Sequence, residues 1–79
     1  MENQGHSFSI RFARVLQQAR LARGLSQEDL ARLAGLHRTY VGLIERGRRK
    51  PTIEVGHALA TALGVPLSGL IREAEASES

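Results

Sequence analysis

Four basic residues stand close together just past the middle of the chain. Arg46, Arg48, Arg49 and Lys50 fall within five consecutive positions. Side chains of this kind bind phosphate groups, because guanidinium and ammonium groups donate charge-assisted hydrogen bonds to anionic oxygens. A run of like charges is more often a solvated surface, so the run alone leaves both interpretations open.

The charge of the whole chain favours a polyanionic partner. The 79 residues carry eleven basic and eight acidic side chains, a net charge of +3. Three of the acids, Glu73, Glu75 and Glu78, lie in the last seven residues, and without them the chain carries a net charge of +6. A basic body is typical of proteins that bind nucleic acid. An inert arginine-rich surface would have the same composition, so charge does not decide between the two.

The residue types that enzymes and metal sites use are scattered or missing. His6, His37 and His57 have no acidic partners at metal-ligand spacing, and the chain has no cysteine. It also lacks a nucleophile elbow and a phosphate-binding glycine loop. We therefore expect no enzyme activity, no metal and no cofactor. There is no membrane-length apolar run and no signal-peptide pattern, so we expect a cytoplasmic protein without a membrane partner.

The stretch from Ser26 to Gly47 has the pattern of two short amphipathic helices joined by a tight turn. Ser26, followed three residues later by Asp29, predicts a helix N-cap close to a capping box. Gly35 predicts the end of that helix, and His37 is a weak cap for the next. Apolar residues recur at helical spacing, at Leu30, Ala31, Leu33 and Ala34 and then at Tyr40, Val41, Leu43 and Ile44. Two helices joined by a short glycine-containing turn form a helix-turn-helix.

Three further helices are predicted around this pair, which gives an all-α fold of five helices. Ser7 is the predicted cap of the first, which runs to about Arg23. We expect residues 1–6 to form a flexible leader, residues 7–72 the folded domain, and residues 73–79 an acidic, disordered tail.

The fourth helix is predicted to begin after Thr52 and to end at Leu63, before Gly64. Gly56 lies inside this helix, where a glycine costs about 1 kcal/mol of stability against alanine. It either permits a close approach of another helix or leaves the core poorly filled. The core face of this helix is expected to contain Ile53, Leu59, Ala60 and Leu63.

Pro66 fits the first turn of a fifth, short helix. Leu67, Leu70 and Ile71 are all apolar, and a domain this small would struggle to bury all three. We therefore interpret them as a dimer interface. The alternative is that this helix folds back onto the first one.

The chain resembles the helix-turn-helix of the lambda-repressor and Cro type (the XRE-like family). The similarity rests on Gln27 at the start of the first helix of the motif, Ala31 at the helix crossing, Gly35 in the turn, and the run from Ile44 to Gly47. With Arg48–Thr52 and the later Ala60–Val65, it covers roughly residues 8 to 72.

The resemblance implies double-stranded DNA as the partner, with the second helix of the motif in the major groove. It places Arg38, Thr39, Tyr40 and Gly42 toward the bases. Arg38 is the strongest candidate for reading a base, since its planar fork matches guanine; the alternative is a phosphate contact. For Tyr40, a phosphate contact and a half-buried core position stay equally open.

The resemblance also assigns residues to the DNA backbone and to the support of the second helix. It places Gln27 against phosphate, and the basic loop of Arg46, Arg48, Arg49 and Lys50 becomes a phosphate-binding segment. It further implies that Glu45 pairs with Arg20, an ion pair that orients the second helix. Arg20 is a second candidate for phosphate.

These features predict a sequence-specific transcriptional regulator that binds a roughly palindromic operator as a homodimer. The run His37-Arg38-Thr39-Tyr40 and the short chain resemble controller proteins of restriction-modification systems. We expect no small-molecule ligand and no ligand-sensing domain. The alternative is an antitoxin-like or adaptor module that keeps the fold with weak or no specific DNA binding.

Overall fold

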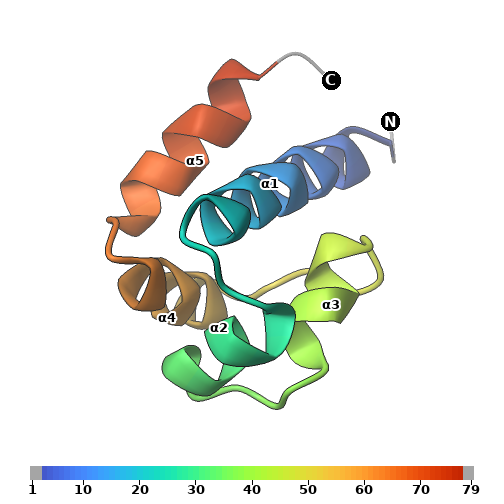
Figure 1. The fold of residues 1–79 in the computed structure, drawn as a ribbon. Coiled ribbons are helices and arrows are strands. Elements are labelled where there is room, and N and C mark those ends of the chain that lie inside the picture. The colour runs from blue at the N-terminus through green and yellow to red at the C-terminus, as the bar shows by residue number, and fades with distance from the viewer. Residues whose placement is uncertain (1–2, 78–79) are drawn as a thin grey trace.

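The computed structural model describes residues 3–77 and folds them into five α-helices, with no β-strand among these residues (Figure 1). The helices are α1 (Asn3–Ala22), α2 (Gln27–Ala34), α3 (Tyr40–Glu45), α4 (Ile53–Leu63) and α5 (Leu67–Ala76). The predicted all-α fold class and the order of its helices are confirmed.

The first and last helices lie side by side, and α2, α3 and α4, which come between them in the chain, lie on one side of α1 (Figure 1). α1 packs on α5 and α3, α2 packs on α3 and α4, and α4 packs on α5. The helix-turn-helix is therefore held by α1 on one side and by α4 on the other.

One apolar core joins all five helices. Six large side chains in it are less than 2% exposed: Leu16, Leu30, Val41, Ile44, Leu59 and Leu63. Leu70 and Ala74 bring α5 into the same cluster. Each fully buried side chain of this size contributes about 1.5–3 kcal/mol, so the core carries most of the stability of so short a chain.

The predicted caps of α2 and α4 are confirmed. The Ser26 hydroxyl accepts a hydrogen bond from the Asp29 amide at 2.9 Å, and the Asp29 carboxylate accepts one from the Ser26 amide at 3.1 Å. At α4, the Thr52 hydroxyl accepts from the Val55 amide at 3.0 Å. These bonds satisfy amides that have no partner inside the helix.

Two helices extend beyond their predicted ends. α1 begins at Asn3, so Ser7 lies inside the helix and is not its cap. Once Phe12 is packed in the core, adding polar residues to the helix costs little, because each added residue forms a backbone hydrogen bond. Met1 and Glu2, the first residues of the predicted leader, lie outside the described residues.

α5 continues through Ala76, into the segment expected to be a disordered tail. The reason is that Ala74 is fully buried and that Arg11 of α1 donates a hydrogen bond from Nε to its carbonyl oxygen at 3.0 Å. Glu78 and Ser79 lie outside the described residues.

Ile53, predicted for the core, and Leu33, predicted for the apolar face of its helix, are both exposed. Leu33 is 58% exposed because Leu30 and Ala31 set the buried face of α2, and Leu33 is turned away from the centre of that face by about 110°. Ile53 is 81% exposed because helical side chains point toward the N-terminus, so the first residue of α4 projects beyond the helix.

The fifth helix folds back onto the first, which was the alternative interpretation of its apolar residues. Leu70 is only 3% exposed and belongs to the core, so its assignment to a dimer interface was wrong. Leu67 and Ile71 are half-buried at the edge of this packing. A Cβ atom on Gly56 would lie 3.3 Å from Cδ1 of Leu67, so this glycine permits a close approach of α4 and α5.

Candidate nucleic-acid interface

The turn between α2 and α3 is fixed by backbone hydrogen bonds. Gly35 has a φ of 74°, a left-handed conformation that favours glycine. Its amide donates to Arg32 O at 3.1 Å, and the Leu36 amide donates to Ala31 O at 2.8 Å. Ala31 is fully buried, in agreement with the small residue expected at the helix crossing.

The predicted ion pair between Arg20 and Glu45 is present. The two side chains form a bidentate contact, with Nε to Oε2 at 2.7 Å and Nη2 to Oε1 at 3.0 Å. They are 8% and 2% exposed, respectively. Arg20 also donates from Nη1 to the Leu25 carbonyl at 2.8 Å. With these donors engaged and the side chain buried, Arg20 is not available to phosphate, which corrects that part of the prediction.

Two glutamines complete the surroundings of the Glu45 carboxylate. Oε1 accepts hydrogen bonds from Nε2 of Gln27 at 2.8 Å and from Nε2 of Gln17 at 3.3 Å. The carboxylate at the end of α3 is thereby tied to α1 and to the start of α2. Removing one partner from a buried charge pair of this kind typically costs about 3–5 kcal/mol.

The part played by Gln17 was missed in the sequence. It lies three residues before Arg20 on α1, and residues at this spacing share a helix face. That spacing was the available signal.

Gly42 does not have the exposure expected of a residue that contacts bases. It is buried, and a Cβ atom placed on it would lie 2.9 Å from Oε1 of Gln27 and 3.1 Å from Nη1 of Arg46. The two longer side chains thus cover this point of α3. The assignment of Gly42 to base contact was wrong, and its role in the structure is to leave room for Gln27.

The other residues expected at DNA bases lie at the exposed beginning of α3. Arg38 and Thr39 belong to the turn that precedes it, and Tyr40 is its half-buried first residue. The cap assigned to His37 is a contact within this turn: its Nδ1 accepts a hydrogen bond from the Thr39 amide at 3.2 Å. Arg38 lies 3.7 Å from the Glu28 carboxylate, with 75% of its side chain exposed.

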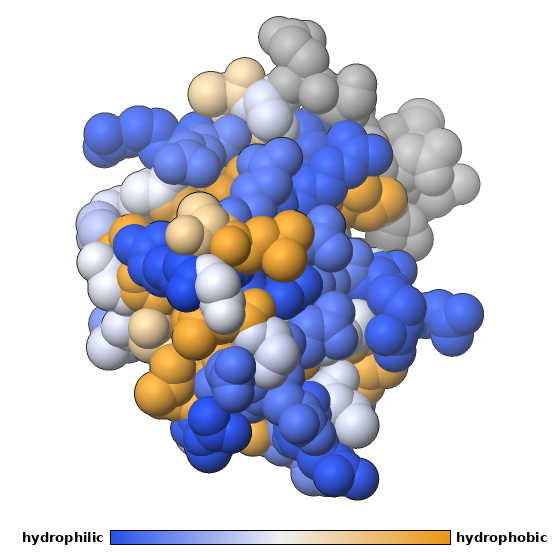
Figure 2. All heavy atoms as spheres, in the orientation of Figure 1, coloured by the Kyte–Doolittle hydropathy of each residue, from blue (hydrophilic) through white to orange (hydrophobic). Residues whose placement is uncertain are grey.

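The chain after α3 reverses at Gly47, whose φ is 76°. The Gly47 amide donates to Ile44 O at 3.0 Å, and the Arg48 amide donates to Leu43 O at 2.9 Å. The basic loop that follows, residues 46–50, is exposed throughout. In the orientation of Figure 1, the surface over α3 and this loop is mostly hydrophilic (Figure 2).

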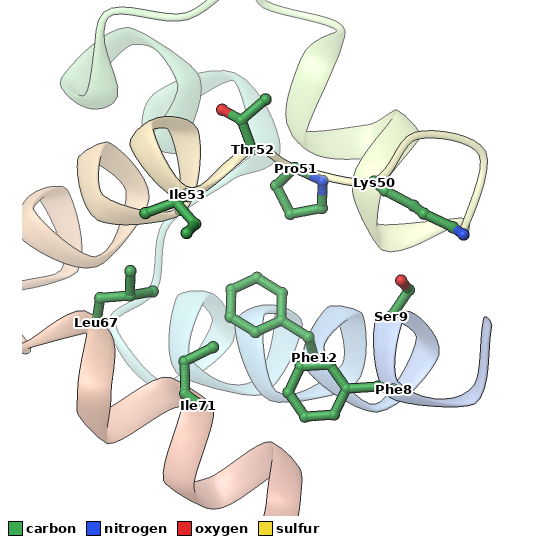
Figure 3. Close-up of a pocket in the computed structure, with 10 residues that line it drawn as sticks. Phe8, Ser9, Phe12, Lys50, Pro51, Thr52, Ile53, Leu67 and Ile71 are labelled. Atoms are coloured by element: carbon green, nitrogen blue, oxygen red, sulfur yellow. The ribbon is translucent and has the colours of Figure 1, made fainter. Parts of the chain in front are cut away.

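A separate apolar groove lies between α1, the start of α4 and α5 (Figure 3). Its volume is about 210 Å³, and its apolar walls come from Phe8, Phe12, Pro51, Ile53, Leu67 and Ile71. This groove was not foreseen, because it needs the spatial arrangement of three helices.

The described residues contain no cluster of His, Cys, Asp or Glu that could hold a metal ion. Within the same residues, no single helix is long and apolar enough to cross a membrane; α4 and α5 meet that criterion only together, across a bend of 102°.

Comparison with known proteins places the chain in a family. A family model described as "Helix-turn-helix" matches residues 16–70. The chain is 36% identical over 67 residues to control protein C.BamHI of Bacillus amyloliquefaciens, a match covering 84% of this chain and 83% of that protein. It is 47% identical over 47 residues to control protein C.SmaI of Serratia marcescens, covering 60% and 56% of the two chains.

The fold is similar to a solved structure as well. The crystal structure of the restriction-modification controller protein C.AhdI from Aeromonas hydrophila superposes with a TM-score of 0.76 and 45% identity, covering 78% of this chain and 94% of that one. The chain nevertheless spans less than two thirds of several curated relatives, among them C.SmaI at 56%.

These relatives are named as control or controller proteins, not as enzymes, in agreement with the expectation of no enzyme activity. The matched segment contains the capped α2, the glycine turn and the buried anchors of α3. The resemblance stated from these residues is confirmed, and the chain belongs to the helix-turn-helix family.

Proposed function

We propose that the protein is a sequence-specific DNA-binding transcription regulator that acts in the cytoplasm as a homodimer. One observation carries this proposal: α3 presents positive charge to solvent at both of its ends. Arg38 precedes it and the basic loop follows it, all exposed. Glu45, the acid within α3, is buried and neutralised by Arg20. No carboxylate of α3 therefore opposes an approaching phosphate backbone.

Base reading is assigned to the beginning of α3. Arg38, Thr39 and Tyr40 lie there, and in a helix-turn-helix the first residues of the second helix reach the base edges. The Arg38 side chain is exposed and its contact with Glu28 is long, so it can move to a guanine at little cost. A bidentate pair with guanine discriminates by about 1–3 kcal/mol.

Phosphate contacts are assigned to the basic loop and to the start of α2. Arg46, Arg48, Arg49 and Lys50 would supply affinity and register without sequence choice. The Gln27 side-chain amide is already bonded to Glu45, so a phosphate contact at this position would come through main-chain amides at the N-terminus of α2.

Dimerisation is assigned to the apolar groove. Ile53 is 81% exposed at its edge, and the half-buried Leu67 and Ile71 line it. A second copy of this chain is the occupant we propose, because a two-fold axis brings the same apolar patch from both copies into one self-complementary contact.

The oligomeric state tests this assignment directly. We expect the wild-type protein to sediment as a dimer and Ile53→Asp to sediment as a monomer. Leu33→Asp is the matched control. Leu33, like Ile53, is an exposed aliphatic residue, with 58% of its surface accessible, but it lies on α2 away from the groove. A wild-type monomer, or equal disruption by both variants, would contradict the groove as the interface.

We further propose that the regulator is a controller protein of a restriction-modification system. The support is that C.BamHI and C.SmaI are named control proteins and that C.AhdI is named a restriction-modification controller protein.

Selection from a pool of random duplexes at moderate salt tests the function. We expect enrichment of an inverted repeat with half-sites about 34 Å apart. Arg38→Ala should then relax the preference at one base position per half-site, whereas Arg48→Ala should weaken all sequences equally and lower the salt slope by about one unit. An unenriched pool would contradict specific recognition, and no binding would favour a protein-interaction module.

A further inference from the structure

Arg49 and Tyr40 form a contact that the assignment of phosphate and base residues does not use. The Cζ atom of Arg49 lies 5.3 Å from the centroid of the Tyr40 ring. This is within the range of a cation–π interaction, in which a guanidinium is attracted to the negative face of the ring. A side chain of the basic loop is thus stacked on the first residue of α3.

The chain reversal at Gly47 explains how two residues nine positions apart meet. α3 has six residues and is therefore only about 9 Å long. The Arg48 amide is bonded to Leu43 O at 2.9 Å, which turns the following residues back along the helix. The Arg49 guanidinium then reaches the first residue of α3, while the Arg48 amide is held at the last turn of the helix.

The stack acts on the orientation of the tyrosine. The ring of Tyr40 packs on the buried core, and the guanidinium of Arg49 covers it from the loop. Because the hydroxyl continues the axis of the ring, a ring held in this way has a fixed hydroxyl direction. The loop and the beginning of α3 are thereby joined before any DNA is bound.

We infer that Arg49 is the positioning residue for Tyr40: its stacked guanidinium sets the direction in which the Tyr40 hydroxyl meets DNA. This inference rests on the proposed function. It separates Arg49 from Arg48, which has the same charge and lies in the same loop but is stacked on no aromatic ring among residues 3–77. Arg48 contributes its charge to DNA binding, whereas Arg49 contributes its charge and also orients the Tyr40 hydroxyl.

The contact can be tested without DNA. Tyr40 is the only tyrosine of the chain, which has no tryptophan, so tyrosine fluorescence reports on this side chain alone. We expect acrylamide quenching of this fluorescence to rise in Arg49→Gln and to stay at the wild-type value in Arg48→Gln. The two variants remove the same charge from the same exposed loop. Equal quenching in the two variants would overturn the inference.

A double-mutant cycle tests the consequence for binding. On the selected duplex, we expect Arg49→Gln to lose about two- to fivefold more affinity than Arg48→Gln, the size of an exposed cation–π contact. In the Tyr40→Phe background this excess should vanish, because the hydroxyl to be positioned is gone. Thermal unfolding followed by circular dichroism controls for the fold.

The possible failures are distinguishable. An excess loss that persists in Tyr40→Phe would overturn the positioning role and leave the proposed function intact. Absence of specific binding by the wild-type protein would overturn the proposed function and the positioning role with it, whatever the quenching shows.

Discussion

The two ends of α3 are built in opposite ways. At its last residue, the Glu45 carboxylate is 2% exposed and accepts hydrogen bonds from Arg20, Gln17 and Gln27. Before its first residue, Arg38 is 75% exposed and has only a 3.7 Å contact with Glu28. One end fixes the direction of the helix, and the other leaves the Arg38 side chain free to adjust. The difference separates the buried support of the helix from the exposed residues to which we assign recognition, within a helix of six residues.

Breaking the buried end should have the largest effect. Glu45→Ala leaves the Arg20 guanidinium buried without its partner, and we expect the free energy of unfolding to fall by about 3–5 kcal/mol. Urea unfolding followed by circular dichroism measures this. Arg38→Ala at the exposed end should change stability by no more than about 0.5 kcal/mol. Similar losses in both variants would show that the two ends are not built differently.

Gly42 offers a smaller and more selective change to the same buried end. A Cβ in Gly42→Ala would lie 2.9 Å from Oε1 of Gln27, so this side chain must move away from Glu45. Losing a hydrogen bond to a charged group destabilises the fold by about 1.5–3 kcal/mol. Replacing a helical glycine with alanine stabilises it by about 1 kcal/mol. We expect a net destabilisation of about 1 kcal/mol by these terms.

The background variant Gln27→Ala sharpens this test. With the glutamine side chain removed, Gly42→Ala should become neutral or stabilising by up to about 1 kcal/mol. A loss of the same size in both backgrounds would mean that Gly42 is needed for a reason other than room for Gln27.

The smallest expected effect is a pH dependence of stability, which comes from Asp29 at the start of α2. Hydrogen bonds from the Ser26 amide, together with Arg32, lower the pKa of Asp29 from its ordinary value of 3.8. A carboxyl group whose pKa is lower in the folded state stabilises the fold above its unfolded pKa and loses this contribution as the pH falls through the folded value. Asp29→Asn should therefore be less stable than wild type at pH 7, with the difference shrinking below pH 3.8. A difference independent of pH would contradict this.

The local features of the fold were predictable from the sequence. Ser26, Thr52 and Gly35 act through hydrogen bonds or backbone conformation within a few residues, so their spacing is sufficient to identify them. The pairing of Arg20 with Glu45 spans 25 positions and was predicted through the family resemblance, not from spacing.

The errors arose where packing between helices decides the outcome. Leu70 was assigned to a dimer interface because the sequence does not show that α5 packs on α1. Gly42 was assigned to base contact from its position near the start of α3. The Gln27 side chain that covers it comes from α2, and the sequence does not show this contact. Ile53 was placed on the core face of its helix for a different reason: it is the first residue of α4, and its side chain projects beyond the helix.

The packing of α1 on α5 also bears on how the chain folds as it is synthesised. Arg11 and Ala74, which are bonded across these helices, are 63 positions apart. The apolar face of α1 is therefore synthesised before α5, the helix that covers it. Nascent chains without α5 therefore expose Phe12 and the apolar residues around it. An exposed apolar surface of this kind promotes aggregation and is bound by chaperones.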